Sequence, residues 1–201
     1  MSNMVHLNGN ILCAVDVETT GRDPEKHDII QIAVLPLDSQ IKPRKDILPF
    51  YMEIAPRRPE NAELSAGGVN KLQLAKIINE GMDSYRAADL LEEWFLKLKL
   101  PENKRISPLA QNWCFDRGFL IQWLGPRMFE FIFDGRYRDT MTAALYCNDK
   151  ADFMGEAFPY PKVNLEYLSS QLKVENIKAH DALSDCVTTA EVYRRMLTGL
   201  I

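Results

Sequence analysis

Residues 13–23 read CAVDVETTGRD, where an apolar segment is interrupted and followed by acids. The apolar run Ile11–Val17 predicts a strand that is apolar on both faces, as expected of a central strand covered on two sides. Asp16 interrupts the run and Glu18 follows it. Residues two apart on a strand share a face, so the two carboxylates lie side by side. Such a pair repels, and burying it unpaired is costly, whereas a divalent cation would remove both problems.

The remainder of the chain predicts one α/β domain that spans residues 1–201. Three strands come first, and helices then alternate with short strands, which favours a central mixed sheet of about five strands flanked by helices. Gly125 and Pro126 are typical of a helix end. We expect strands at 11–17, 29–37, 50–54, 107–110 and 137–139, and helices at 71–80, 84–98, 115–124, 140–148, 164–171 and 181–197.

The last expected helix carries both apolar residues and an acid. Its apolar residues recur at helical spacing and predict a stripe that faces the core. Asp185 lies well off this stripe. The expected stripe consists of Leu183, Val187, Ala190, Met196 and Leu197.

The candidate functional residues also have ordinary explanations. Asp116 stands at the start of an expected helix, where an acid complements the helix dipole. Asp185 can be a solvated helix acid, and His180 can cap the helix that follows it. For Asp16 and Glu18 the ordinary explanation is a solvated strand end, which is harder to accept in a strand this apolar.

The charge of the chain limits the kind of partner. The 201 residues carry a formal net charge of −4, and four acids at one metal site would account for a charge of that size. A broad basic field that holds a long duplex is therefore not expected. The charge fits a short single-stranded end that is held by local contacts. Exposed aromatic residues at 153–160 either stack on bases or anchor a loop.

The cysteines favour a reducing compartment. They lie far apart, form no CxxC pair and stand in apolar or helical contexts, so we expect buried free thiols. No signal segment opens the chain and no apolar run reaches about 18 residues, so we expect a cytoplasmic protein that does not enter a membrane. The four residues are Cys13, Cys114, Cys147 and Cys186.

Four segments together resemble the motifs of a known family. They read DVETTG at 16–21, AGGVNKL at 66–72, NWCFDRGFL at 112–120 and HDALSDCVTTAEVY at 180–193. The first, third and fourth resemble the three motifs of the DEDDh 3′→5′ exonucleases, which include the epsilon proofreading subunit of DNA polymerase III, ribonuclease T, oligoribonuclease and phage-type enzymes. Each motif alone is weak, but three in order along nearly the whole chain are specific.

This resemblance implies a ribonuclease H-like fold and two Mg²⁺ or Mn²⁺ ions. Two such cations about 4 Å apart can hold the attacking water and the leaving oxygen on opposite sides of phosphorus, and they prefer oxygen ligands. The implied metal ligands are Asp16, Glu18, Asp116 and Asp185. His180 would be the general base, which we expect on a loop or at the helix start. The residues implied to lie against the 3′-terminal nucleotide are Thr19, Thr20, Val69, Asn70 and Phe115.

The implied activity is stepwise release of nucleoside 5′-monophosphates from the 3′ end of a single strand, with DNA favoured over RNA. A DNA polymerase partner and a proofreading role are open expectations. Gln111 stands where many members have histidine, which affects local packing or substrate preference. Two alternatives are a catalytically inactive nucleic-acid-binding or polymerase-associated module and an HD-type phosphohydrolase. The latter needs further histidine ligands, and only His6 and His27 remain.

Overall fold

The computed structural model describes residues 4–63, 71–176 and 178–199. Among the helices of these residues, none combines the length and the apolar character that a membrane-spanning segment requires. The strands are β1 (Ile11–Thr19), β2 (Ile29–Pro36), β3 (Phe50–Glu53), β4 (Ile106–Ala110) and β5 (Arg138–Asp139). The helices are α1 (Lys71–Glu80), α2 (Ser84–Lys97), α3 (Trp113–Ile132), α4 (Thr140–Phe153), α5 (Leu165–Gln171) and α6 (Ala182–Thr198), with short 3-10 turns at Val5–Leu7 and Pro59–Asn61.

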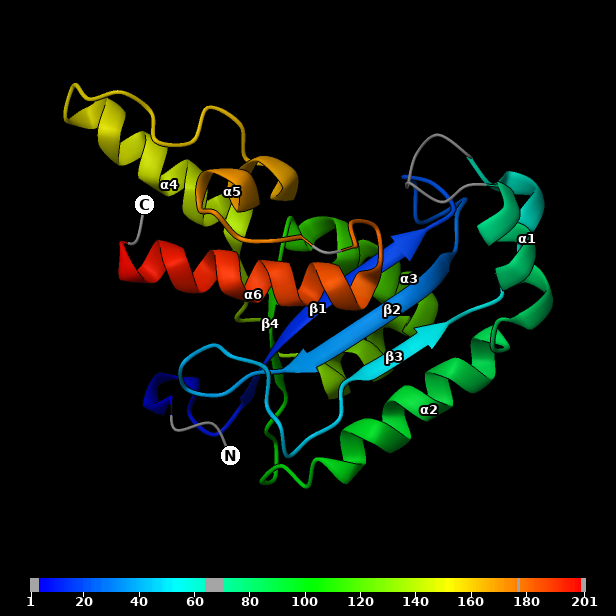
Figure 1. The fold of residues 1–201 in the computed structure, drawn as a ribbon. Coiled ribbons are helices and arrows are strands. Elements are labelled where there is room, and N and C mark those ends of the chain that lie inside the picture. Colours follow the sequence, from blue (N-terminus) through cyan, green and yellow to red (C-terminus); the bar gives the residue numbers. More distant parts are fainter. Residues whose placement is uncertain (1–3, 64–70, 177, 200–201) are drawn as a thin grey trace.

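The five strands form one mixed sheet in the order β3-β2-β1-β4-β5. β1, β2 and β3 pair in antiparallel fashion as a meander, whereas β4 and β5 join the sheet in parallel with β1. Figure 1 shows the long strands β1 and β2 at the centre, as expected for the most apolar segments. The expected α/β architecture with about five strands is confirmed.

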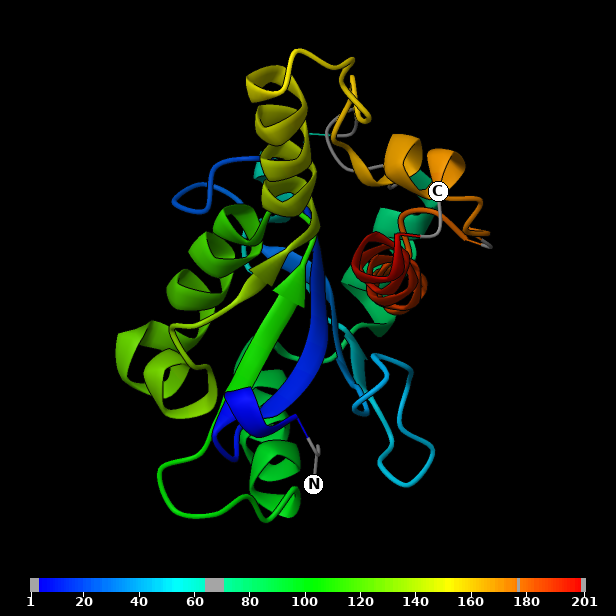
Figure 2. The same cartoon turned by 90° about the vertical axis from the view of Figure 1, so that its left-hand side faces the viewer.

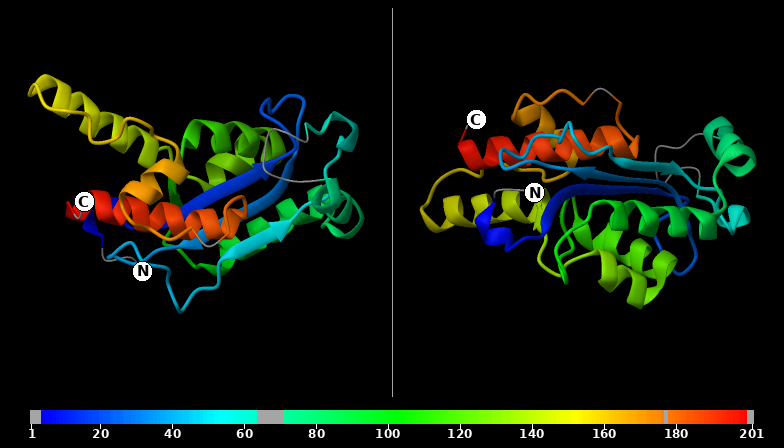
Figure 3. Two further views of the ribbon diagram at one scale, coloured as in Figure 1. Left: turned by 45° about the horizontal axis from the view of Figure 1, so that its top comes forward. Right: turned by 90° about the horizontal axis from the view of Figure 1, so that it is seen from below.

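Helices cover the two faces of the sheet unequally. Figure 3 shows α6 on one face and α2 and α3 on the other. Residues of β1 alternate between these layers: Cys13 and Val15 pack in the cluster that contains α2 and α3, whereas Leu12 and Ala14 pack against α6. Because the side-chain period of a strand is two, the even-numbered residues that follow Ala14 continue along the α6 face.

The buried face of α6 includes Leu183, Ala190 and Met196 of the expected stripe but differs from it at two positions. Val187 is 44% exposed and Leu197 is 61% exposed, whereas Cys186 and Ala190 lie against the sheet. Asp185 is 8% exposed, so the ordinary explanation of a solvated helix acid does not apply to it. Small residues at the contact let the helix axis approach the sheet closely. A prediction based on the spacing of large apolar side chains does not identify such small residues as buried.

Two helices are longer than the sequence pattern predicted. Gly125 breaks α3 with φ 75° and ψ 156°, but Pro126 opens a second helical segment that continues to Ile132. Proline suits this position because the first turn of a helix does not use its N–H. α4 runs to Phe153 instead of ending near residue 148. Figure 2 shows α4 projecting from the body of the molecule.

The thiols are free, as expected, but not all of them are buried. Cys13 and Cys186 are buried, Cys147 is half-buried and Cys114 is exposed. Cys114 lies in the first turn of α3 between buried Trp113 and half-buried Phe115, so it points outward. The expectation of four buried thiols was therefore wrong for Cys114.

The α6 contact predicts a difference between two neighbouring substitutions. Ala190→Leu should lower the free energy of unfolding by about 1–3 kcal/mol, because extra methylenes in a packed contact force strain. Val187→Leu is the matched control on the exposed side and should change it by less than about 0.5 kcal/mol. Urea unfolding of both variants measures the difference. Equal effects would contradict the packing of α6 described above.

Candidate active site

β1 presents two carboxylates on the face that α6 covers. Asp16 and Glu18 continue the even-numbered series of Leu12 and Ala14, and Glu18 is 8% exposed while Asp16 is half-buried. On β2 their pairing partners are Ala33 and Gln31. The sheet therefore places both acids near the C-terminal end of its central strand, as the sequence predicted.

Asp116 reaches the same strand from the first turn of α3. Its Oδ1 accepts a hydrogen bond from the backbone N–H of Val17 at 3.0 Å, and the side chain is 2% exposed. α3 follows β4, which runs parallel to β1, so its N-terminus lies at the edge of the sheet where β1 ends. The positive end of the helix dipole favours a carboxylate at this position.

Asp185 lies in the first turn of α6, and both of its carboxylate oxygens accept hydrogen bonds. Asn176 donates from Nδ2 to Oδ1 at 3.2 Å, and the backbone N–H of His180 donates to Oδ2 at 3.1 Å. These contacts fix the orientation of the carboxylate. Sequence analysis missed Asn176, because nothing in its local pattern indicates a contact with a residue on the next helix.

His180 lies in the turn just before α6, where the sequence placed it. It has a left-handed backbone with φ 63°, and its side chain is exposed. The N-cap of α6 is Asp181, whose carboxylate accepts from the backbone N–H of Ser184. A capping role for the imidazole is therefore not needed.

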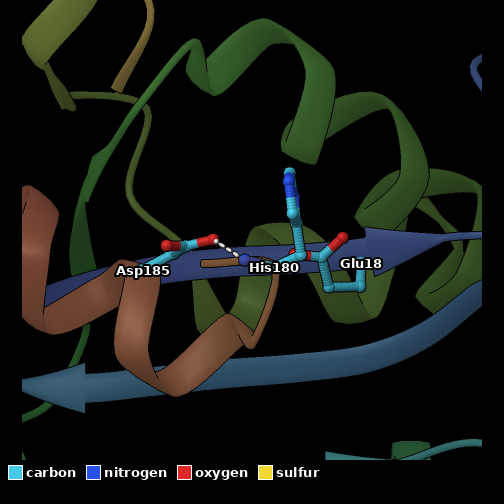
Figure 4. A group of neighbouring side chains, drawn as sticks. All are labelled: Glu18, His180 and Asp185. Carbon is cyan, nitrogen blue, oxygen red and sulfur yellow. Dashed lines mark hydrogen bonds between the residues drawn. The ribbon is translucent and has the colours of Figure 1, made fainter. Parts of the chain in front are cut away.

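Three side chains form a candidate metal site. Glu18, His180 and Asp185 each offer a ligand atom within 4.8 Å of the other two. Figure 4 shows that they come from β1, from the turn before α6 and from α6 itself. Asp16 and Asp116 lie outside this group of three but border it, since Asp116 contacts the backbone between Asp16 and Glu18.

Burial and mutual repulsion raise the pKa values of these carboxyl groups. Burial, followed by the charge of Asp16, raises the pKa of Glu18 to about 9. Burial, followed by the charge of Asp185, raises the pKa of Asp16. The pKa of Asp116 is raised well above its usual range by burial and by Asp16, and that of Asp185 is raised chiefly by burial. The site therefore favours protons or cations, and its carboxylate oxygens suit Mg²⁺ or Mn²⁺.

Gln31 joins β2, where it pairs with Glu18 of β1, to the start of α6. Its Oε1 accepts a hydrogen bond from the backbone N–H of Ala182 at 3.3 Å, which ties the start of α6 to β2. A single glutamine in an otherwise apolar strand was the sequence signal that could have indicated this role. Gln31 also lines a hollow of about 170 Å³ beside His180, together with Glu53, Lys76 and Lys178.

The loop after β1 is held by its own hydrogen bonds. Thr19 donates from Oγ1 to the carbonyl of Gly21 at 2.6 Å, and Thr20 Oγ1 accepts from the N–H of Asp28 at 3.0 Å. His27 packs so closely on Gly21 that a Cβ there would lie 2.4 Å from its ring. Both threonines are buried beside the carboxylates, and their hydroxyl groups serve the loop itself.

The other residues expected near a terminal nucleotide fall into two groups. Phe115 is half-buried on α3 and packs on Phe119, with ring centroids 5.0 Å apart. Val69 and Asn70 lie outside the described residues.

Gln111 has a structural role. Its Nε2 donates to the carbonyl of Val163 at 2.8 Å, and its Oε1 accepts from Thr140 Oγ1 at 2.5 Å. The side chain thus joins the end of β4 to the start of α4 and to the segment before α5. These hydrogen bonds fit an effect on local packing, and an effect on substrate preference stays a prediction.

Comparisons with known proteins identify sequence relatives of this chain. The protein-family model described as Exonuclease matches residues 13–193. An oligoribonuclease of Aliivibrio fischeri is 34% identical over 148 residues, which cover 68% of this chain and 74% of the relative. An oligoribonuclease of Vibrio parahaemolyticus is 31% identical over 140 residues, which cover 64% of this chain and 70% of the relative.

A solved structure shares the fold at low sequence identity. The nuclease domain of 3′hExo, a DEDDh family member solved with rAMP bound, has a TM-score of 0.68 and 17% identity to this chain. The alignment covers 99% of this chain and 95% of that domain. The ribonuclease H-like architecture expected from the motifs is therefore confirmed.

The raised pKa values predict how stability depends on pH in chelator. An unfolded carboxyl group has a pKa of about 4, so the folded protein binds more protons than the unfolded chain until the pH exceeds the raised value. The free energy of unfolding should therefore fall as the pH rises from about 5 to about 9. Glu18→Gln should flatten this slope, whereas Glu130→Gln, at an exposed carboxylate on α3, should not. Urea unfolding in EDTA at several pH values measures this slope. A slope that Glu18→Gln leaves unchanged would contradict the raised pKa of Glu18.

The contact between Asn176 and Asp185 predicts an effect on metal affinity. Asn176→Ala frees one oxygen of Asp185, and loss of such an orienting partner typically costs about 10- to 100-fold. Titration with Mn²⁺, followed by calorimetry, measures the change. Asn164→Ala is the control, because the Asn164 side chain makes no capping hydrogen bond on α5. An unchanged Mn²⁺ affinity in Asn176→Ala would refute the prediction.

Proposed function

This chain belongs to the exonuclease family and is a 3′→5′ exonuclease of the DEDDh type, and on that premise we propose that it degrades short single strands with two Mg²⁺ or Mn²⁺ ions. The observation that carries the proposal is the convergence of four carboxylates from β1, α3 and α6. A binding module without catalysis would gain nothing from acids that repel one another.

We propose that the four carboxylates are the metal ligands. Glu18 and Asp185 are near enough to share one ion, and Asp116 is held beside Asp16 through its bond to Val17. When bound, the two cations neutralise the phosphodiester and stabilise charge on the attacking and leaving oxygens. The protein contributes fixed ligand positions, because Asp116 and Asp185 are already oriented by hydrogen bonds.

His180 is proposed to accept the proton of the attacking water. Its ring is exposed and lies within reach of Glu18 and Asp185. Histidine suits proton transfer because its side chain changes charge between about pH 5 and pH 8. The proposed contacts with the 3′-terminal nucleotide involve the loop after β1, the N-terminal turn of α3 and residues 66–72. Their members are Thr19, Thr20, Val69, Asn70 and Phe115.

Short RNA is the proposed substrate, since both curated relatives are oligoribonucleases. The preference for DNA expected from the sequence finds no support in the described side chains. A polymerase partner and a proofreading role stay predictions. The four free thiols support the expected cytoplasmic location, because disulfides are rare there.

The proposed function is tested with RNA and DNA strands of equal length and sequence, labelled at the 3′ or the 5′ end. With Mg²⁺, we expect loss of the 3′ label first, release of 5′-monophosphates and faster degradation of RNA. Chelator should abolish activity. Asp16→Ala should lower the rate by several orders of magnitude, and this variant also serves as the control for a contaminating nuclease. Degradation from a 5′ end would overturn the direction, and faster degradation of DNA would overturn the substrate.

The role of His180 is tested with two variants. Asparagine tolerates a left-handed backbone as histidine does, so His180→Asn preserves the turn and the N–H bond to Asp185, and His180→Ala tests the side chain further. Both should lower turnover at least about 100-fold and flatten the acidic limb of the pH–rate profile, with little change in Mn²⁺ affinity. Near-normal turnover in His180→Asn at saturating Mg²⁺ would remove His180 from the mechanism.

A further inference from the structure

A second cavity lies far from the carboxylates. It measures about 320 Å³ and is bounded by the C-terminal end of α2, the connection to β4 and the C-terminal part of α3. Arg105 at its rim directly precedes β4, whose first residue pairs with Ile11 at the start of β1. Glu18 lies seven residues further along β1, at a distance of about 23 Å for a strand rise of about 3.3 Å. Figure 1 shows this connection away from the arrowhead of β1.

The floor of the cavity is apolar and partly open to solvent. Phe95 and Phe131 meet edge to face, with ring centroids 5.3 Å apart and planes at 78°. Phe131 is 44% exposed and the adjoining Leu96 is 57% exposed. Large apolar side chains beside a hollow are suited to receive another apolar side chain.

The rim of the cavity is positively charged. Lys99, Lys104 and Arg105 surround it, with Glu102 as the acid among its lining residues. Within the described part of the chain, none of the three cations makes an ion pair or a side-chain hydrogen bond. This local excess of positive charge stands out in a protein whose formal net charge is −4.

The rim is already ordered by its backbone. The N–H of Lys104 donates to the carbonyl of Pro101 at 3.0 Å, and the N–H of Arg105 donates to Asn10 Oδ1 at 3.1 Å. The aliphatic stem of Lys104 lies over Gly9, where a Cβ would meet it at 3.2 Å. A ligand would therefore spend little free energy on ordering this loop.

We propose that this cavity binds an acidic peptide segment of a partner protein, with one apolar side chain on the Phe95–Phe131 floor and carboxylates at the cationic rim. Nucleic acid would match the same charges, but a strand whose 3′ end is at the catalytic carboxylates would have to pass around the edge of the sheet to reach the cavity. The docking site goes beyond the exonuclease activity and does not depend on it.

Fluorescence anisotropy with a labelled peptide, Asp-Glu-Asp-Glu-Leu-Phe, tests the proposal. We expect saturable binding that weakens with salt and with a peptide in which Ala-Ala replaces Leu-Phe. Lys99→Glu/Arg105→Glu should weaken binding at least about tenfold, because like charges then face each other. Lys150→Glu/Lys162→Glu makes the same change in net charge at exposed lysines outside the cavity and should leave binding unchanged.

Three results would overturn the docking site. The first is an absence of peptide binding to the full chain, and the second is equal peptide binding by the two double variants. The third uses oligothymidylate as a single-stranded nucleic-acid probe: Lys99→Glu/Arg105→Glu would lose binding of this probe without losing binding of the peptide. Melting curves establish that each variant is folded. Leu96→Asp, at an exposed position on the floor, tests the apolar contact separately and should also weaken peptide binding.

Discussion

The structure depends on holding together carboxylates that repel one another. Burial raises the pKa values of Asp16, Glu18 and Asp116, so the folded chain bears a free-energy cost at the end of β1. Two features offset part of this cost. The acids from α3 and α6 stand at helix N-termini, where the dipole favours negative charge, and backbone N–H groups donate to Asp116 and Asp185. Bound cations would relieve the remaining repulsion.

The position of α6 determines whether the fourth carboxylate can join the others. The fully buried part of its contact with the sheet consists of the small side chains Ala182, Cys186 and Ala190, and the larger Leu183 and Tyr193 pack at the border of this contact. The start of the helix is tied to β2 through Gln31. Because α6 lies close to the sheet at this contact, Asp185 is within reach of Glu18. The contact between α6 and the sheet therefore both contributes to the core and positions a carboxylate of the site.

The sequence predicted the strand β1, the order of the elements and the shared face of Asp16 and Glu18, because these follow from local periodicity. It did not predict the burial of Asp185, because the apolar pattern of α6 marks Val187 and Leu197, which the fold leaves exposed. Nor could it indicate Asn176, whose contact with Asp185 joins separate segments. The ligand roles of the four acids stay predictions, and Val69 and Asn70 lie outside the described residues.

The contact between Gly21 and His27 restricts how this protein can diverge. A methyl group at Gly21 would meet the imidazole at 2.4 Å, beside a loop whose hydrogen bonds already hold Thr19 and Thr20. A larger residue at position 21 is therefore admissible only when position 27 becomes smaller. In a lineage of such sequences position 27 can become smaller while glycine stays at position 21, but a side chain at position 21 should appear only together with or after that change.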